Sequence, residues 1–319
     1  MKPQVNESIR GTSGASEEAL QGELFDAAPV REVVVNGASY AVREVGPPEG
    51  RPILLLHGFP ETGRSWRRVA PRLAHAGLRV LVPDLKGYGR SSKPKPGAGV
   101  GHAAPPVGGV GDYRVSALAA ELGELILALG YAKLDVVGHD WGGILLAAMT
   151  RVARGRLDRI AILNAPFRWF VPWAPRHVYE FNVPGLPERR FWREPVHFVR
   201  EIATRWSASD PFDDADVRDM TRNLQFGGSF ACAMAYYRGL TRDLGFLAPA
   251  LWSPPTDPPR ALVLFGARDP IMPPFVAHRA HQDLAGSTLV LIDDAGHFVQ
   301  SEAPERVATA LIDFFGAGR

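Results

Sequence analysis

Short apolar runs alternate with helical stretches along most of this chain, and this alternation limits the folds that it can adopt. Four runs are continuous and rich in Val, Ile and Leu, as buried parallel strands are; they lie at 53–58, 79–84, 134–140 and 159–166. Helical stretches separate them, at 65–76, 115–129 and 141–154. The alternation predicts βαβ units and an α/β fold whose mostly parallel sheet is covered by helices on both faces.

The alternation stops between residues 167 and 259, a region rich in aromatic residues, Arg and Pro. Its sequence predicts helices and loops without a buried strand. Beyond it the pattern resumes with strand-like runs and helical stretches at 261–270, 274–284, 287–293 and 304–315. We therefore predict one α/β core, interrupted by a helical insert at 167–259 and built from residues 25–166 and 260–319.

The N-terminal part of the chain adds a hairpin and a tail. The runs 31–35 and 39–45 are joined by Asn36 and Gly37, a pair that favours a two-residue hairpin turn. Residues 1–24 are polar, small and acidic, so we expect them to form a largely disordered tail.

Composition excludes several classes of function. The 319 residues carry a formal net charge of +2, which gives no reason to expect nucleic acid or an anionic membrane as a partner. Cys232 is the single cysteine, so no intrachain disulfide and no cysteine-based metal cluster is expected, and we predict a packing role for it. No apolar stretch is long enough to span a bilayer and no secretory signal is recognised, so a cytoplasmic location is the default expectation.

A glycine-rich segment at 94–111 superficially resembles a dinucleotide-binding loop. It contains Gly97, Gly99 and Gly101, but His102 stands where the fingerprint needs its third glycine, and no helix follows directly. We therefore expect no nucleotide cofactor, nor any other cofactor or metal. The Gly, Pro and Ala content predicts a solvated, mobile flap near the edge of the insert, affecting substrate entry.

The segment 138–143, with the sequence GHDWGG, carries the most specific chemical signal. It lies between an apolar strand and a helix, where a G-x-nucleophile-x-G sequence forms a sharp turn that exposes its central side chain. That side chain is Asp140, where related elbows have Ser. A carboxylate is already ionised and can displace a leaving group at a saturated carbon, which leaves an alkyl ester. The structural alternative is that Asp140 only caps the following helix.

Two further residues complete a catalytic triad in the expected chain order. Asp269 and His297 each follow a predicted strand, and they come after Asp140 in the order nucleophile, acid, histidine. Open α/β sheets place their sites at these carboxyl ends of strands. Each residue alone has a structural explanation, as a turn residue or a packed histidine. Their coincidence predicts that His297 is the base and that Asp269 orients it.

The run at 56–60, with the sequence LHGFP, is expected to supply part of an oxyanion hole. A loop after this strand provides one backbone N–H and the residue after the nucleophile provides the other. We assign these donors to Phe59 and Trp141, which we also expect to contact the substrate. His57 is expected to hold the loop in place.

Together these motifs resemble the epoxide hydrolases of the α/β-hydrolase superfamily over nearly the whole chain after the tail. The matching segments are HGFPE at 57–61, DLKGYGRSS at 84–92, GHDWGG at 138–143 and GHFVQ at 296–300. The resemblance implies an α/β-hydrolase fold, a helical cap formed by residues 167–259, and hydrolysis of a small apolar epoxide to a diol. It also implies that two acids on the cap hydrogen-bond the epoxide oxygen.

The resemblance assigns those two acids residue by residue. Tyr237, within Tyr236-Tyr237-Arg238, matches the second acid. The first acid is usually Tyr, but its position falls on His177, similar to a minority of family members that use a His–Tyr pair. Tyr179 remains a rival for this position and a candidate substrate contact. Packing inside the cap is the structural alternative for all three residues.

Other functions remain open at this point. A haloalkane dehalogenase shares the Asp nucleophile, and Trp141 could be one halide donor, but the second donor is often an Asn where Phe59 stands here. Among haloacid dehalogenases, a haloacetate dehalogenase would need Arg in place of Trp141 to hold the substrate carboxylate. A non-catalytic small-molecule receptor of the hydrolase fold would not need His297. The many aromatic residues of the insert suit either an apolar ligand or a packed insert core. The sequence allows a homodimer without indicating one.

Overall fold

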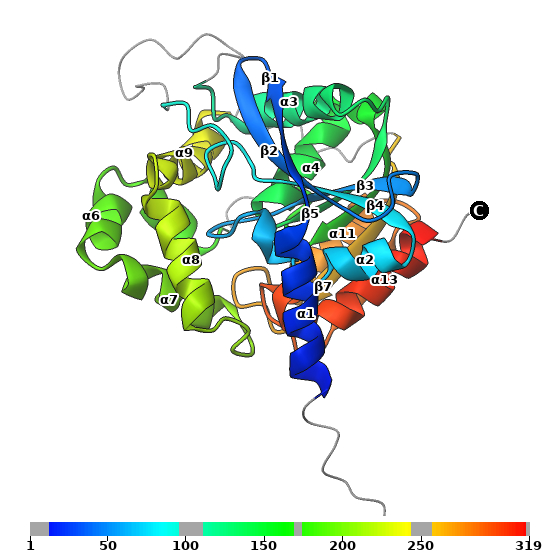
Figure 1. Ribbon diagram of the computed structural model, residues 1–319. Coiled ribbons are helices and arrows are strands. Elements are labelled where there is room, and N and C mark those ends of the chain that lie inside the picture. The colour runs from blue at the N-terminus through cyan, green and yellow to red at the C-terminus, as the bar shows by residue number, and fades with distance from the viewer. Residues whose placement is uncertain (1–12, 96–110, 169–173, 244–256, 317–319) are drawn as a thin grey trace, which may run out of the picture.

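The computed structural model describes residues 13–95, 111–168, 174–243 and 257–316, with side chains described from residue 20 onward. It contains one eight-stranded sheet in the order β1-β2-β4-β3-β5-β6-β7-β8 (Figure 1). The strands β1 and β2 are antiparallel, β2 pairs with β4 antiparallel, and all other pairs are parallel. The strand bounds are β1 Val30–Val35, β2 Ala38–Val45, β3 Arg51–Leu56, β4 Leu78–Pro83, β5 Leu134–His139, β6 Leu157–Leu163, β7 Arg260–Gly266 and β8 Thr288–Ile292.

Successive side chains of the central strands enter two separate hydrophobic layers, because side chains alternate between the faces of a sheet. Leu54 and Leu56 of β3 pack with one layer, whereas Ile53 and Leu55 pack with the other. The first layer is covered by helices α3 (Val115–Ala128), α4 (Trp141–Val152) and α11 (Pro274–Asp283). The second is covered by α2 (Ala70–His75), α12 (Val299–Glu302) and α13 (Pro304–Gly316). The predicted α/β fold is therefore confirmed.

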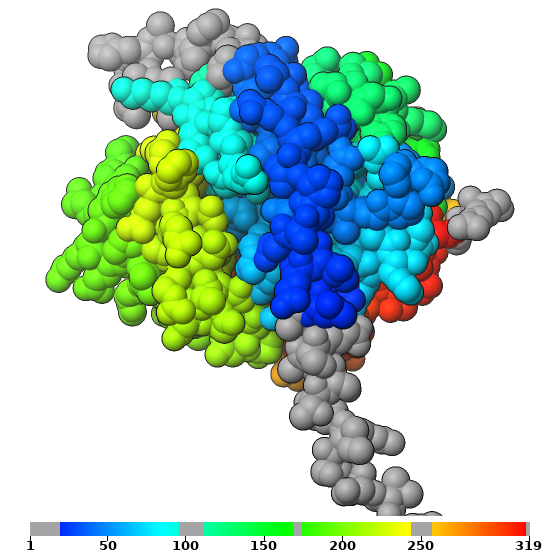
Figure 2. All heavy atoms as spheres, viewed as in Figure 1, coloured from blue at the N-terminus to red at the C-terminus, as the bar shows by residue number. Residues whose placement is uncertain are grey.

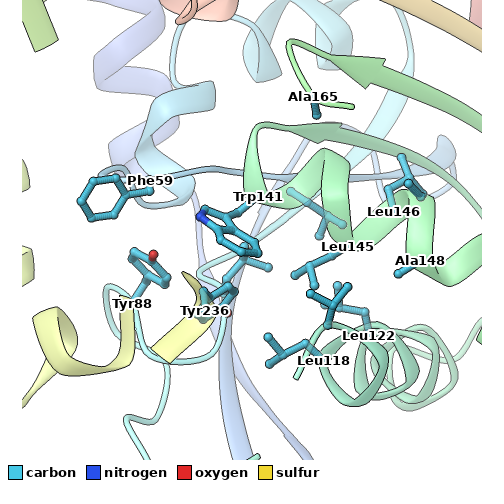
Figure 3. Packing of buried hydrophobic residues seen from close by; sticks show 14 of the residues in the cluster. Phe59, Tyr88, Leu118, Leu122, Trp141, Leu145, Leu146, Ala148, Ala165 and Tyr236 are labelled. Carbon is cyan, nitrogen blue, oxygen red and sulfur yellow. The ribbon is translucent and has the colours of Figure 1, made fainter. Parts of the chain in front are cut away.

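The packing of α3 against α4 illustrates the first layer. Leu118 and Leu122 of α3 face Leu145 of α4, with Trp141 at the start of α4 reaching towards Tyr236 (Figure 3). Burial of each such side chain stabilises the fold by about 1.5–3 kcal/mol. The start of α4, where the nucleophile candidate lies, is thus fixed on a packed and rigid element.

The expected helix at 65–76 is divided into two shorter elements. A 3₁₀ helix, η2, spans Gly63–Trp66, and α2 begins only at Ala70. Pro71 explains the break, because its nitrogen has no hydrogen to donate to a preceding turn and it suits only the start of a helix. A short 3₁₀ helix, η3 (Arg154–Arg156), likewise follows α4.

The expected disordered tail is wrong for residues 13–24, because helix α1 spans Ser13–Ala27. Contacts at its C-terminal end explain the difference. Phe25 is buried, and one guanidinium nitrogen of Arg43 on β2 donates to the carbonyl oxygens of Phe25 and Ala28 at 3.0 and 2.7 Å. These bonds hold the C-terminal end of α1 against β2. Residues 1–12 of the expected tail lie outside the described residues.

Five helices occupy the described part of the insert, and no strand of the sheet falls there. They are α5 Arg176–Asn182, α6 Leu186–Arg193, α7 Pro195–Trp206, α8 Asp214–Gln225 and α9 Ser229–Arg242. They gather on one side of the sheet (Figure 1). Phe191 and Phe230 stack at 4.1 Å between ring centroids, so part of the insert's aromatic content forms its own core.

The space-filling view places this insert, in green and yellow, beside a blue strip formed by hairpin β1–β2 and helix α1 (Figure 2). The glycine-rich segment expected to form a flap falls at 96–110, outside the described residues. Among the helices that are described, none combines the length and the apolar character needed to cross a membrane.

Candidate active site

Asp140 lies directly after β5 in a backbone conformation that only a sharp turn produces. Its φ is 49° and its ψ is −117°, and its side chain forms no capping bond to α4. The flanking glycines are required by close packing: a Cβ on Gly138 would lie 2.4 Å from the Gly142 carbonyl oxygen, and a Cβ on Gly142 would lie 2.4 Å from that of Leu56. Such strain concentrates at functional sites. The helix-capping explanation of Asp140 is therefore wrong.

The carboxylate of Asp140 is held between a backbone donor and an imidazole. The N–H of Phe59 donates to Asp140 Oδ1 at 2.9 Å, and His297 Nε2 lies 3.4 Å from Asp140 Oδ2. Gly58 permits this approach, because a Cβ there would lie 2.5 Å from the Cβ of Asp140. One carboxylate oxygen is thus bound to an amide while the other faces the imidazole.

Asp269 orients His297 from the other side of the ring. Asp269 Oδ2 lies 2.8 Å from His297 Nδ1, and the backbone N–H groups of Ile271 and Met272 donate to Asp269 Oδ1, both at 2.8 Å. Asn164, after β6, donates through Nδ2 to Asp269 Oδ2 at 2.7 Å. The structure therefore brings Asp140, His297 and Asp269 together in one buried chain of contacts.

The proton affinities of the two central groups follow from this arrangement. Burial lowers the pKa of His297, but the Asp269 charge and the hydrogen bonding and charge of Asp140 outweigh it and raise the pKa to about 10. Burial raises the pKa of Asp140, but bonding and charge from His297 outweigh it, so the pKa is lowered. Near neutral pH the pair is therefore an imidazolium facing a carboxylate.

A second buried network fixes the main chain of His297. His139 Nε2 lies 2.8 Å from the His297 carbonyl oxygen, which makes it the donor, and Gln300 Nε2 donates to His139 Nδ1 at 3.1 Å. The same Gln300 amide donates to Glu61 at 3.1 Å. Sequence reasoning missed the roles of these residues and of Asn164. They lie in or beside recognisable motifs, but only the fold shows that they meet.

His57 holds the loop that carries Phe59, as the sequence predicted. The N–H of Leu85 donates to His57 Nε2 at 2.9 Å, which ties the loop after β3 to the loop after β4. Burial is the main reason that the pKa of His57 is lowered. It is therefore a neutral acceptor in a structural bond.

Tyr237 and His177 reach the site from two helices of the insert. The Tyr237 ring lies 4.9 Å from Trp141, 5.7 Å from Phe59 and 5.7 Å from His177 between ring centroids. The Tyr237 hydroxyl is buried and has no hydrogen-bond partner among the residues that the structure describes. Burial, and then the charge of Asp140, raise the pKa of Tyr237 well above its usual value. It is therefore a neutral phenol close to the Asp140 carboxylate.

His177 lies beside Tyr237, whereas Tyr179 does not reach the site. The ring of His177 packs 4.6 Å from Trp206, and burial lowers its pKa to about 4, so it is neutral near pH 7. Tyr179 is 59% exposed. Residues two apart on a helix point in nearly opposite directions, which explains the difference. The expected substrate contact through Tyr179 is therefore wrong.

A cavity of about 730 Å³ opens at the boundary between insert and core. His177, Phe181, Trp206 and Ile271 form its apolar wall, and Arg176, Glu180, Arg190, Glu201 and Arg205 form its charged part. Ligand sites are commonly concave and mostly apolar with a few polar groups. Within the described ranges, no group of three His, Cys, Asp or Glu side chains is arranged to hold a metal ion.

Comparison with known proteins agrees with this geometry. The sequence matches the family described as alpha/beta hydrolase fold over residues 51–304. It is 27% identical to epoxide hydrolase A of Mycobacterium tuberculosis, covering 90% of this chain and 97% of that protein. It is also 27% identical to a soluble epoxide hydrolase of a Corynebacterium species, covering 89% and 96%.

A solved structure shows the same likeness. The crystal structure of epoxide hydrolase A from Mycobacterium thermoresistibile is 26% identical and superposes with a TM-score of 0.75, covering 91% of this chain and 99% of that one. The family match extends from β3 to the start of α13 and so includes Asp140, Asp269 and His297. The chain therefore belongs to the α/β-hydrolase-fold family.

Proposed function

We propose that this protein hydrolyses epoxides to vicinal diols through an alkyl ester on Asp140. The observation that carries the proposal is the ionised Asp140 carboxylate, held on a strained turn with one oxygen on the Phe59 N–H and the other facing His297. A carboxylate nucleophile suits displacement at a saturated carbon. The similarity to proteins named epoxide hydrolase supports the same reaction.

In the first step, Asp140 attacks a ring carbon of the epoxide from behind and the carbon–oxygen bond breaks. The neutral phenol of Tyr237 gives its proton to the departing oxygen, and the neutral imidazole of His177 donates a second hydrogen bond to it. General acid catalysis of this kind contributes about a hundredfold to ten-thousandfold. The buried, unpaired hydroxyl of Tyr237 and the His177 ring beside it support this assignment.

Ester formation then changes the charge that acts on His297. The hydrogen bond and the negative charge of Asp140 both raise the pKa of His297. Both are lost when the carboxylate becomes an ester, so the pKa of His297 falls. The imidazolium then loses its proton, which restores the phenol of Tyr237. The neutral imidazole can now act as a base. In this proposal the first step itself prepares His297 for the second.

In the second step, His297 removes a proton from water and the hydroxide attacks the carbonyl carbon of the ester. The N–H groups of Phe59 and Trp141 stabilise the oxyanion, a contribution worth about 3–4 kcal/mol per donor in comparable sites. Collapse of this intermediate releases the diol, which takes the remaining carboxyl proton. Asp140 and the His297 imidazolium are then restored.

We further propose that α5–α9, within residues 167–259, act as a cap that supplies the two acids and excludes water. Trp206 at the end of α7 supports this, because its carbonyl oxygen accepts a bond from the His297 N–H at 2.9 Å. The insert is thus joined directly to the residue that activates water. The exclusion of water strengthens electrostatic interactions inside a site.

Dehalogenation is the rival reaction, and the donors favour an oxygen leaving group. An alkoxide must be protonated as it leaves, whereas a halide only needs to be solvated. Tyr237 can supply a proton, and Phe59 provides no side-chain donor for a halide. Release of halide from chloroalkanes without diol formation from epoxides would reverse this assignment.

The direct test uses mass spectrometry of the intact protein. His297→Gln mixed with a panel of epoxides should gain the mass of one epoxide on Asp140, because the ester forms but is not hydrolysed. The matched control His281→Gln changes a histidine of α11 whose Nδ1 contacts Ser287, away from the triad, and should accumulate no adduct. The proposed function would be overturned if His297→Gln formed no adduct and the wild type hydrolysed none of the epoxides.

A further inference from the structure

Tyr88 is a second buried phenol near the nucleophile. It lies in the loop after β4, it is 2% exposed, and its hydroxyl has no hydrogen-bond partner within the described part of the chain. A buried hydroxyl without a partner is costly, and most buried polar groups are paired. The unpaired hydroxyl of Tyr88 therefore needs an explanation. One explanation is that a polar group of a bound ligand is its hydrogen-bond partner.

The ring of Tyr88 is held firmly from two sides. It packs edge-on against His57, with 5.2 Å between ring centroids, and against Tyr236, with 5.5 Å. His57 itself is fixed by the bond from the Leu85 N–H, and the Tyr236 hydroxyl donates to the Lys86 carbonyl oxygen at 2.8 Å. The direction of the Tyr88 hydroxyl is therefore set by packing.

The hydroxyl points towards two residues that are close to the nucleophile in the chain or in space. Figure 3 shows the Tyr88 oxygen pointing towards Phe59 and Trp141, the residues whose backbone lies beside Asp140. The electrostatics agree, because after burial the charge of Asp140 is the next cause of the raised pKa of Tyr88. Tyr88 is thus a neutral donor close to the carboxylate that would attack the substrate.

Different rings pack on Tyr88 and on the insert acid Tyr237. Tyr237 packs with Phe59, His177 and Phe181, whereas the rings that pack on Tyr88 are His57 and Tyr236. Tyr237 and His177 suffice for the oxygen of the epoxide ring. A third donor near Asp140 is then available to another oxygen of the substrate, close to the attacked carbon.

We propose that Tyr88 is a specificity-determining residue that donates a hydrogen bond to an oxygen on the substituent next to the epoxide ring. The preferred substrates are then epoxides with an ether, hydroxyl or carbonyl oxygen at that position, such as glycidyl ethers. This inference rests on the proposed function, because it assumes that Asp140 attacks an epoxide.

Two matched substrates test it: phenoxymethyl oxirane and phenethyl oxirane, which differ by an ether oxygen in place of a methylene group. For each protein, kcat/KM is measured for both, and the ratio of ether to carbon analogue is compared with the wild-type ratio. Tyr88→Phe should lower this ratio about tenfold, as expected for one lost hydrogen bond. Comparison of ratios removes the difference in intrinsic reactivity between the two substrates.

Tyr236→Phe is the matched control, because it removes a neighbouring buried hydroxyl that already has a partner. It should leave the ratio unchanged and lower the melting temperature. Tyr88→Phe should leave the melting temperature unchanged or raise it, because no protein bond is lost. The inference would be overturned if Tyr88→Phe kept the wild-type ratio of kcat/KM between the ether and its carbon analogue. It would also be overturned if the melting temperature of Tyr88→Phe fell as much as that of Tyr236→Phe. If the wild type opens neither epoxide, the proposed function itself fails.

Discussion

Asn164 donates a hydrogen bond to Asp269 Oδ2 at 2.7 Å, the same oxygen that lies 2.8 Å from His297 Nδ1. Asn164 is fully buried with a φ of 44°, and its own Oδ1 accepts from the Gly266 N–H at 3.2 Å. The carboxylate is thereby fixed in the plane where it meets the imidazole. The orientation of Asp269 therefore depends on a residue at the end of the neighbouring strand.

Asn164→Asp should slow hydrolysis of the ester more than its formation. The change keeps the side-chain shape but removes the donor and places a second carboxyl group beside Asp269, so His297 is oriented less well. We expect a loss of about tenfold or more in the ester hydrolysis rate, measured by single-turnover kinetics. Asn182→Asp, the same change on α5, is the control; equal rates in both variants would contradict this role.

The origin of the oxygen in the diol tests the covalent route. In a single turnover in oxygen-18 water, the first diol should carry unlabelled oxygen from Asp140, and the label should appear in the Asp140 carboxylate. This follows because water attacks the ester carbonyl and not the epoxide. Mass spectrometry of the diol and of the peptide with Asp140 measures both. Label in the first diol would show direct attack by water.

The two insert acids should differ in their effect on alkylation. Tyr237→Phe keeps the ring but removes the proton donor, so ester formation should slow by about a hundredfold or more. His177→Phe should have a similar or smaller effect, and Tyr179→Phe, at an exposed position, should have little. Rates of adduct formation in the His297→Gln background measure this step alone. If adduct formation became much slower in Tyr179→Phe and kept its rate in His177→Phe, Tyr179 and not His177 would be the first insert acid.

The raised pKa of His297 predicts a pH dependence of stability. Folding raises its pKa from 6.5 to about 10, so the charged imidazolium stabilises the folded state at low pH and this contribution is lost between those values. The free energy of unfolding should fall across this window by at most about 1.4 kcal/mol per pH unit from this residue. Urea unfolding of wild type and His297→Gln should show a flatter profile in the variant. Parallel profiles would indicate that His297 binds no extra proton on folding.

The sequence determined the features that depend on neighbouring residues. Continuous runs of Val, Ile and Leu between helical stretches defined the parallel strands, and the glycines around Asp140 defined the sharp turn. The split of η2 from α2 is also local, because Pro71 could have predicted it. These features were readable because periodicity, glycine and proline act within a few residues.

Tertiary structure decided which distant residues meet. Arg43 caps α1, which the composition of the first residues does not reveal. The helix direction separates His177 from Tyr179, and the fold brings Asn164 to Asp269 across 105 positions of sequence. The physical reason is that a hydrogen bond or a buried charge depends on position in space, which the sheet order and the insert set together. Sequence motifs named the candidate reacting groups, and the packing of distant elements determined their orientation and proton affinity.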